Sequence, residues 1–330
     1  MSSASFRGES CIFSQARRHL PRVRVYGILA VLVTTACPGI ERAGATPVSG
    51  VREAFAGDTI IVIAHRGCWQ SAPENSLAAI EACIELGVDM VELDVRQTRD
   101  GALVVIHDET LDRTTDRAGF VGSAMLSEIH HARLRAGAGG QGTRLTSERL
   151  PTLREALQLT QDRVLVNLDV KEPIHDAVMA VVDQLGVADQ VLFKLRAAPD
   201  SPDLAAADFH GRAPFMPILA QCNPAVPIGE YCIHSPAGIE TAYGAYAPVA
   251  YELVFHDDRF LQEALVPLRR GGADIWVNTL YPEIAGGRDE HDPDGLRDAI
   301  WGSLIDMGVT AIQTDRPAYL LDYLATRGQR

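Results

Sequence analysis

Ionisable side chains cluster where three apolar runs of the chain come to an end. They are His65 and Arg66 after the first run, Glu92 and Asp94 within the second, and His107 and Asp108 after the third. A charge is costly inside a hydrophobic core, so a cluster at strand ends indicates a site on one rim of a sheet or barrel.

Two of these carboxylates have the spacing of metal ligands. Glu92 and Asp94 are two residues apart in a strand-like run, so both point to one face, about 7 Å apart along the strand. They repel each other unless a positive charge lies between them, and one divalent cation, Ca²⁺ or Mg²⁺, takes such oxygen ligands. Asp169 ends another apolar run and is the candidate third ligand. The alternative is a salt-bridge network with Arg66 and Lys171.

The histidines His65 and His107 indicate proton transfer. An imidazole titrates near neutrality, so a pair at strand ends suits one general base and one general acid. A lone histidine would more often be a hydrogen-bonded core residue. Arg66 and Lys171 are the cations available to hold an anionic substrate, and arginine matches the geometry of phosphate. Together with a metal, these groups favour cleavage of a phosphate ester.

Strand-like and helix-like segments alternate along the chain and must position these residues. Short, continuously apolar runs are typical of strands buried on both faces. Eight β/α units predict an α/β fold, a closed (β/α)₈ TIM barrel. The expected strands are 60–64, 90–95, 164–170, 191–194, 215–219, 250–255, 275–279 and 311–314, and the expected helices are 76–86, 153–160, 174–185, 259–270 and 296–307.

A ninth strand-like run, 103–106, needs a separate account. Only residues 96–102 connect it to the preceding strand, whereas a parallel neighbour needs a crossover of about a dozen or more residues. We therefore expect a hairpin after the second strand, outside the barrel count. A small loop excursion within 96–150 follows, and its polar segment 111–116 is expected to cover the site.

Several short motifs follow one another across residues 60–324. They are HRG at 65–67, PEN at 73–75, ELDV at 92–95, HD at 107–108, LDRTTD at 111–116, LPTLREAL at 150–157, NLDVK at 167–171, IWVN at 275–278 and GVTAIQTDRP at 308–317. Together they resemble the signature of the glycerophosphodiester phosphodiesterase family. By this resemblance, His65 and His107 match the acid–base pair, Glu92 and Asp94 two metal ligands, and Arg66 a phosphate contact.

The chain departs from the family pattern at two positions. The third metal ligand is commonly Glu in the family, whereas Asp169 is a methylene shorter, and Glu172 is the alternative ligand. Lys171 matches a basic position near the phosphate, and Trp276 matches an aromatic residue at the pocket wall. Val277 follows this tryptophan where the family usually has Thr, and plain barrel core is the other interpretation of Trp276.

Residues 1–45 look like an export signal. Four arginines between positions 17 and 24 precede the apolar run 25–36, which is too short to span a bilayer, and residues 43–45 offer a small-residue cleavage site. Cys37 faintly resembles a lipoprotein acceptor, so membrane association through a lipidated Cys37 is the alternative to release. We expect an exported protein, periplasmic or extracellular, whose barrel domain occupies residues 46–330.

The charge of the chain argues against a nucleic-acid partner. The 330 residues have a net charge of −13, and the first 45 carry +4 from six Arg and two Glu, which leaves −17 for residues 46–330. Binding to phosphate backbones recruits Lys and Arg, so we expect a small-molecule phosphodiester substrate and no nucleic acid.

The remaining cysteines and histidines have simpler interpretations. Cys222 and Cys232 bracket a Pro/Gly-rich loop, where a disulfide fits an oxidising compartment, and Cys83 is expected to be a small core residue. Histidines without a motif around them are expected at the surface or as helix caps. They are those at 130, 131, 175, 210, 234 and 291. Tyr251 and Glu252, inside an expected barrel strand, could reach the substrate, but the sequence does not decide this.

The resulting hypothesis is an exported, metal-dependent hydrolase that cleaves a glycerophosphodiester to glycerol phosphate and an alcohol. A second hypothesis keeps the site and changes the substrate to a lysophospholipid, in a phospholipase D-type reaction. A third, of another class, is a non-catalytic binding protein or a metal-dependent sugar isomerase on the same barrel. An isomerase has little use for Arg66 and a histidine pair, and retention of all the polar positions argues against a binding-only protein.

Overall fold

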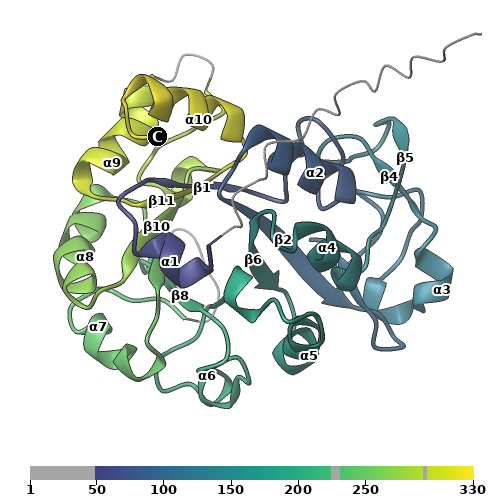
Figure 1. Cartoon of the computed structure of the whole chain (residues 1–330), viewed down its shortest axis with the longest axis horizontal. Helices are drawn as coiled ribbons and strands as arrows, with labels where there is room; N and C mark the ends of the chain where they lie inside the picture. The colour runs from purple at the N-terminus through teal and green to yellow at the C-terminus, as the bar shows by residue number, and fades with distance from the viewer. Residues whose placement is uncertain (1–48, 224–230, 293–295) are drawn as a thin grey trace, which may run out of the picture. The chain divides into compact units, whose positions relative to one another are not determined.

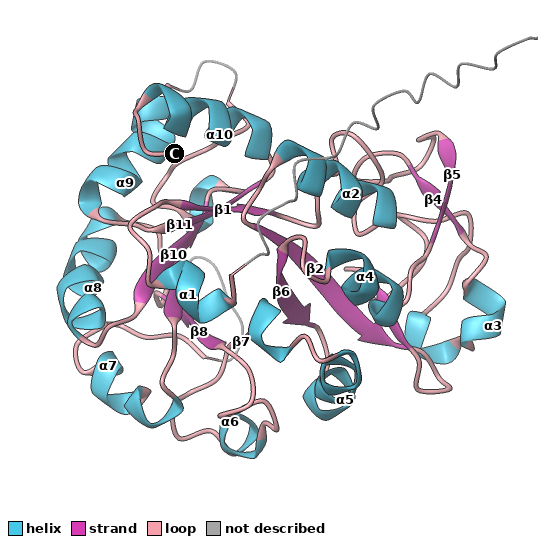
Figure 2. Ribbon diagram, viewed as in Figure 1, coloured by secondary structure: helices cyan, strands magenta, loops and turns pink. Residues whose placement is uncertain are grey.

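Eight parallel strands form a closed barrel at the centre of the fold (Figures 1 and 2). This computed structural model describes residues 49–223, 231–292 and 296–330, all within one compact unit, Ala45–Arg330. The strands pair in the order β1-β11-β10-β9-β8-β7-β6-β2, and β1 also pairs with β2, which closes the predicted barrel. They are β1 (Ile61–Ala64), β2 (Met90–Gln97), β6 (Leu165–Val170), β7 (Val191–Leu195), β8 (Phe215–Ala220), β9 (Ala250–Val254), β10 (Asp274–Asn278) and β11 (Ala311–Thr314).

Helices surround the barrel, and α2 has clear capping residues at both ends (Figure 2). The Ser76 hydroxyl accepts a hydrogen bond from the Ala79 N–H at the start of α2, and Gly87 ends that helix with φ 80°. Left-handed backbone at this position favours glycine because a side chain would be strained. The helices are α1 (Val51–Phe55), α2 (Leu77–Leu86), α4 (Leu153–Thr160), α5 (His175–Leu185), α6 (Pro202–Ala206), α7 (Ile239–Ala242), α8 (Asp258–Arg270), α9 (Ser303–Met307) and α10 (Pro317–Thr326).

The barrel interior is apolar at the N-terminal ends of its strands. Ile61, Met90 and Leu165 lie at the starts of three strands and pack there with Val51 and Phe55 of α1. A second apolar layer packs between the strands and the outer helices. Polar side chains are therefore concentrated toward the C-terminal mouth, which is where barrels of this class carry their sites.

The hairpin predicted after the second strand is confirmed. Strand β3 (Leu103–Val105) pairs antiparallel with β2, with Val95 opposite Val105. The excursion that follows contains α3 (Leu126–Ile129) and a two-stranded sheet of β4 (Arg133–Arg135) and β5 (Leu145–Arg149). It is more ordered than a loop because it has an apolar cluster of its own, made of Val104, Ile106, Leu111, Val121, Ile129, Leu134 and Leu150.

Two disulfides are present in the described part of the chain. Cys222 and Cys232 are bonded, as predicted. Cys83 is buried in the core, as expected, but the sequence analysis missed its disulfide bond to Cys68. The turn after β1 folds back onto α2, where the Cys68 N–H donates to the Ala79 carbonyl, and this brings the two Cα atoms to 5.2 Å.

Residues 1–48 and 224–230 lie outside the described residues. The export signal over 1–45 and the lipidation of Cys37 therefore remain predictions. Among the helices that the structure describes, none combines the length and apolarity needed to cross a membrane.

Candidate active site

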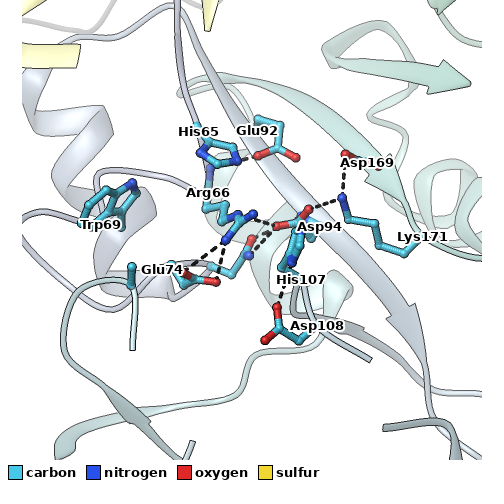
Figure 3. A network of polar contacts seen from close by, with 12 residues as sticks. His65, Arg66, Trp69, Glu74, Glu92, Asp94, His107, Asp108, Asp169 and Lys171 are labelled. Carbon is cyan, nitrogen blue, oxygen red and sulfur yellow. Dashed lines mark hydrogen bonds and ion pairs between the residues drawn. The ribbon is translucent and has the colours of Figure 1, made fainter. Parts of the chain in front are cut away.

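Three carboxylates meet inside the barrel near its C-terminal mouth (Figure 3). Glu92 and Asp94 point inward from β2, and Asp169 comes from β6, in register with Asp94. One oxygen of each residue lies within 4.8 Å of the others, and both β2 carboxylates are 1% exposed. We call these three residues the carboxylate centre. Its buried hard-oxygen donors fit a divalent cation such as Ca²⁺ or Mg²⁺.

The only two lysines of the chain both reach the carboxylate centre. Lys171 Nζ lies 2.8 Å from Asp94 Oδ1 and 2.8 Å from Asp169 Oδ2. Lys194 on β7 is buried, and its Nζ lies 3.2 Å from Asp169 Oδ2 and 3.6 Å from Glu252 Oε2. The salt-bridge network considered as an alternative to a metal site is thus present, with Lys194 as a member that the sequence reasoning missed.

Burial and ion pairing shift the pKa values of this centre in opposite directions. Burial raises the pKa of Glu92, and the neighbouring Asp94 carboxylate adds to the rise. Burial also acts to raise the pKa of Asp94, but the charges of Lys171 and Arg66 outweigh it and hold that pKa well below its usual range. For Lys194 burial favours the neutral amine, yet the surrounding carboxylates raise its pKa and keep it charged.

Arg66 is held in place by both its backbone and its side chain. Its φ of 55° is a left-handed conformation that is strained for a residue with a side chain. This conformation lets the Arg66 N–H donate to Glu92 Oε2 at 2.9 Å. The guanidinium lies 3.4 Å from Asp94 Oδ2 through Nε and donates to Glu74 through Nη1. Glu74, from the PEN motif, is buried and also binds Arg113, so the motif holds the site together as well as preceding a helix.

Asn75 of the same motif fixes the orientation of Asp94. Its Nδ2 donates to Asp94 Oδ2 at 2.7 Å, and its Oδ1 accepts from the Asp94 N–H at 3.2 Å. Asn75 is buried and has a φ of 56°, a second strained residue at the site. One carboxylate oxygen of Asp94 is thereby committed to the protein, and the other faces Lys171.

His65 follows β1 and is nearly buried, with 7% of its surface exposed. Its Nδ1 lies 2.8 Å from Oδ1 of Asp315, which follows the adjoining strand β11. The Trp69 indole N–H donates to the same oxygen at 2.7 Å. His291, which we expected at the surface or as a cap, instead has Nε2 3.2 Å from Asp315 Oδ2.

His107 is the more open of the two histidines, with 36% of its side chain exposed. Its Nδ1 lies 2.8 Å from Asp108 Oδ1, and Arg113 donates to both oxygens of Asp108. Burial lowers the pKa of His107, and the charges of Arg66 and Lys171 lower it further. The hydrogen bonds of Arg113 lower the pKa of Asp108 to about 2. Because Arg113 belongs to the excursion, that segment reaches the site as expected.

The positions of Trp276 and Glu172 bear on the alternatives that the sequence left open for each. Trp276 is fully buried in the barrel interior, where its Nε1 donates to Asn278 Oδ1 at 2.7 Å, and Asn278 donates to Glu252. This is the core packing we considered, and contact with substrate remains a prediction. Glu172 accepts from Arg96 at 3.0 Å, whereas Asp169 belongs to the carboxylate centre, so the geometry favours Asp169 as third ligand.

A closed parallel barrel whose mouth carries carboxylates, cations and a histidine pair places the chain among the TIM-barrel enzymes. The family model of the glycerophosphoryl diester phosphodiesterase family matches residues 65–319, and the chain belongs to that family.

Individual relatives match smaller parts of the chain. A glycerophosphodiester phosphodiesterase of Caldanaerobacter subterraneus is 50% identical over 115 residues, which are 34% of this chain and 46% of the relative. The chain spans about half the length of the curated relatives it matches.

Solved structures are similar over most of the barrel. A glycerophosphodiester phosphodiesterase of Agrobacterium tumefaciens has a TM-score of 0.57 and 26% identity, covering 78% of this chain and 97% of that one. A phosphodiesterase of Oleispira antarctica, solved in complex with the product sn-glycerol-3-phosphate, has a TM-score of 0.59 and 20% identity, covering 83% of this chain and 99% of that one. At this identity the second likeness shows the fold alone.

Proposed function

We propose that the protein is a divalent-cation-dependent hydrolase that cleaves glycerophosphodiesters to glycerol phosphate and an alcohol. The observation that carries this proposal is the meeting, at one mouth of the barrel, of the carboxylate centre with two histidines, each held by a carboxylate. Membership of the glycerophosphoryl diester phosphodiesterase family supports the same activity.

The cationic side chains of the site have the geometry to hold a phosphodiester anion. Arg66 is fixed by Glu92, Asp94 and Glu74, and Lys171 spans two carboxylates, so neither cation has to be ordered when substrate binds. Glu92, Asp94 and Asp169 would hold the divalent cation. Bound there, the cation would neutralise negative charge that develops on the phosphate.

The two histidines would exchange the protons of the reaction. One imidazole takes the proton of the attacking hydroxyl, from water or from the adjacent glycerol hydroxyl, and the other gives a proton to the leaving alkoxide. Each has its Nδ1 bound to a carboxylate, so in both cases Nε2 is the ring nitrogen left for proton exchange.

The test is hydrolysis of glycerophosphocholine, coupled to a phosphomonoesterase that releases phosphate. We expect phosphate release in Ca²⁺ or Mg²⁺ and its loss in excess chelator. Preferential activity on lysophosphatidylcholine micelles would point instead to the phospholipase D-type reaction. No release from either substrate, with any divalent cation, would contradict the proposal.

Replacement of the histidines tests their role. His65→Ala and His107→Ala should each abolish turnover, by at least ~10²-fold, because a general acid or base contributes about that much. A near-normal rate in either variant, with the same free energy of unfolding as the wild-type protein, would refute the role of that residue. His234→Ala is the matched control because His234 is exposed and outside the site.

We also propose that the protein is exported, to the periplasm or the extracellular space. Two disulfides in one chain, Cys68–Cys83 and Cys222–Cys232, are typical of an oxidising compartment and support the export signal expected over residues 1–45. Mass spectrometry of the protein recovered from cells decides between a free N-terminus after residue 45 and a lipid on Cys37. A chain that begins at Met1 and remains in the cytoplasm would contradict the proposal.

A further inference from the structure

Closure of the barrel places His65 beside a carboxylate that is 250 residues away in the sequence. Strands β1 and β11 are parallel neighbours, with Ala64 opposite Thr314 at their last positions. His65 and Asp315 are the next residue of each strand, and the His65 N–H donates to the Thr314 carbonyl at 3.1 Å. The two side chains therefore start from adjacent backbone positions on the rim, and their contact of 2.8 Å follows from the register.

Asp315 is itself fixed on every side. Its Oδ1 accepts from Trp69 as well as facing His65, and its Oδ2 lies 3.2 Å from His291 Nε2. Its backbone N–H donates to Glu290 at 2.6 Å, and the residue is 7% exposed. Glu290, His291 and Asp315 have ligand atoms close to one another, and the hydrogen bonds of Glu290 with Thr279, Thr314 and the Asp315 N–H make this cluster a rigid support for Asp315.

The carboxylate remains ionised in this setting. Burial acts to raise the pKa of Asp315, but hydrogen bonds from His65 and Trp69 outweigh burial and lower it. An ionised carboxylate has no proton to give, so His65 must donate through Nδ1. The second ring nitrogen, Nε2, is then unprotonated in the neutral imidazole, and Figure 3 shows the ring beside Glu92 of the carboxylate centre.

We propose that Asp315 is a positioning residue for His65: it holds the imidazole in the Nδ1–H tautomer and in one orientation, so that Nε2 exchanges the proton with substrate. The inference rests on the proposed hydrolase activity for its catalytic consequence. Its structural part, the tautomer, does not depend on that activity. The family motif at 308–317 thereby acquires a physical role for its aspartate.

The first test reads the tautomer directly. The ¹⁵N chemical shifts of the histidine ring are recorded on the full folded chain without substrate, with His65→Gln used to assign the signals of His65. The wild-type protein should show the Nδ1–H tautomer. In Asp315→Asn the new amide can donate to Nδ1, so the signals should change to the Nε2–H tautomer. Unchanged Nδ1–H signals in this variant would overturn the proposal.

The second test separates positioning from folding. Asp315→Asn should lower kcat about 10²- to 10⁴-fold, the range known for misoriented catalytic histidines, and leave KM within about threefold. Asp315→Ala should be similarly impaired and should recover at least about tenfold in added formate, whose carboxylate can occupy the vacated position. A kcat within threefold of wild type in either variant, or no recovery with formate, would overturn the proposal.

The controls separate this inference from the proposed function. Asp322→Asn changes an exposed carboxylate on α10, 65% exposed and paired with Arg297, and should leave kcat unchanged. If the wild-type chain does not hydrolyse glycerophosphocholine, the proposed function fails. The ¹⁵N measurement still decides whether Asp315 sets the tautomer of His65.

Discussion

Replacing Lys194 by Met removes a buried positive charge and keeps most of the side-chain volume. The Lys194 side chain is 4% exposed and enters the centre from β7. Its Nζ lies 3.2 Å from Asp169, 3.6 Å from Glu252 and 4.0 Å from Glu92. Without the ammonium group, Lys171 and Arg66 remain beside Asp94, and in the part of the chain that the structure describes neither of them forms an ion pair with Glu252.

The size of the effect follows from these distances. At an effective dielectric constant of about 20, unit charges 3.2 to 4.0 Å apart attract by roughly 4 to 5 kcal/mol per pair. The desolvation of the ammonium group, several kcal/mol per buried ion, opposes this attraction. Breaking a buried ion pair by removing one partner lowers the free energy of unfolding by about 3 to 5 kcal/mol, and we expect a loss of this size for Lys194→Met.

Urea unfolding followed by tryptophan fluorescence, in the presence of chelator, measures this loss. The matched control is Glu252→Gln, alone and combined with Lys194→Met. Because the two side chains contact each other, the double variant should lose less than the sum of the single losses, by about 1 to 3 kcal/mol. A loss below 1 kcal/mol in Lys194→Met, or strict additivity in the double variant, would refute the conclusion that the charge of Lys194 stabilises this centre through Glu252 and its neighbours.

The same variant reports on metal binding. Lys194 competes for the carboxylate oxygens that a divalent cation would use, so its removal should strengthen binding. Saturating Ca²⁺ or Mg²⁺, at about 100 times its Kd, adds about 2.7 kcal/mol to the free energy of unfolding. At one fixed cation concentration, the stabilisation should be larger in Lys194→Met than in the wild-type protein. Equal stabilisation in both would place the cation away from Lys194.

Three further outcomes follow from the structure. Burial raises the pKa of Glu290 to about 7, so the folded state keeps a proton that the unfolded state loses near pH 4.5. The contribution of this group to the free energy of unfolding is complete below pH 4.5 and falls by roughly 3 kcal/mol between that pH and pH 7. Urea titrations at several pH values should show this fall in the wild-type protein and not in Glu290→Gln. Cys83→Ser opens the bond to Cys68 across a separation of 15 residues and should lower the free energy of unfolding by roughly 3 kcal/mol. Reduction of the wild-type protein also opens Cys222–Cys232, so the loss belongs to Cys68–Cys83 if reduction lowers the stability of the variant by that much less than it lowers the stability of the wild type. Lys171→Met, at 19% exposure, should lower kcat/KM at least about tenfold with a smaller stability loss than Lys194→Met, and the reverse order would contradict the different roles given to the two lysines.

Much of the fold followed from the positions where apolar runs end. Eight runs gave the eight barrel strands, and the short connection after the second strand required a hairpin. In a parallel barrel all the C-terminal strand ends face one mouth, so Glu92, Asp94 and Asp169 could be expected to meet without knowledge of their contacts. The positions of the strand ends can be read from the sequence because the apolar pattern of a strand depends on its burial alone.

The partners of the site residues could not be predicted in the same way. Lys194 carried a signal, since a lysine inside the apolar strand 191–195 must be paired, but the pattern does not say with which residue. The contact of His65 with Asp315 needs the closing register of β1 and β11. The Cys68–Cys83 bond depends on a turn that folds back onto its own helix, and no periodicity describes such a turn.

The distribution of the basic residues explains why lysine occupies the carboxylate centre. Of 30 Lys and Arg, 28 are Arg, and exposed ion pairs such as Arg163–Glu81 use the planar fork of the guanidinium. The centre instead requires a compact charge that several carboxylates from different strands can share, as Asp169 and Glu252 share Lys194 Nζ. Lysine supplies such a point charge, whereas the wider fork of arginine would need space that the packed interior lacks. Lys194→Arg should therefore fail to preserve the stability of the wild-type protein although it preserves the charge, and full stability in that variant would show that charge alone is what the centre requires.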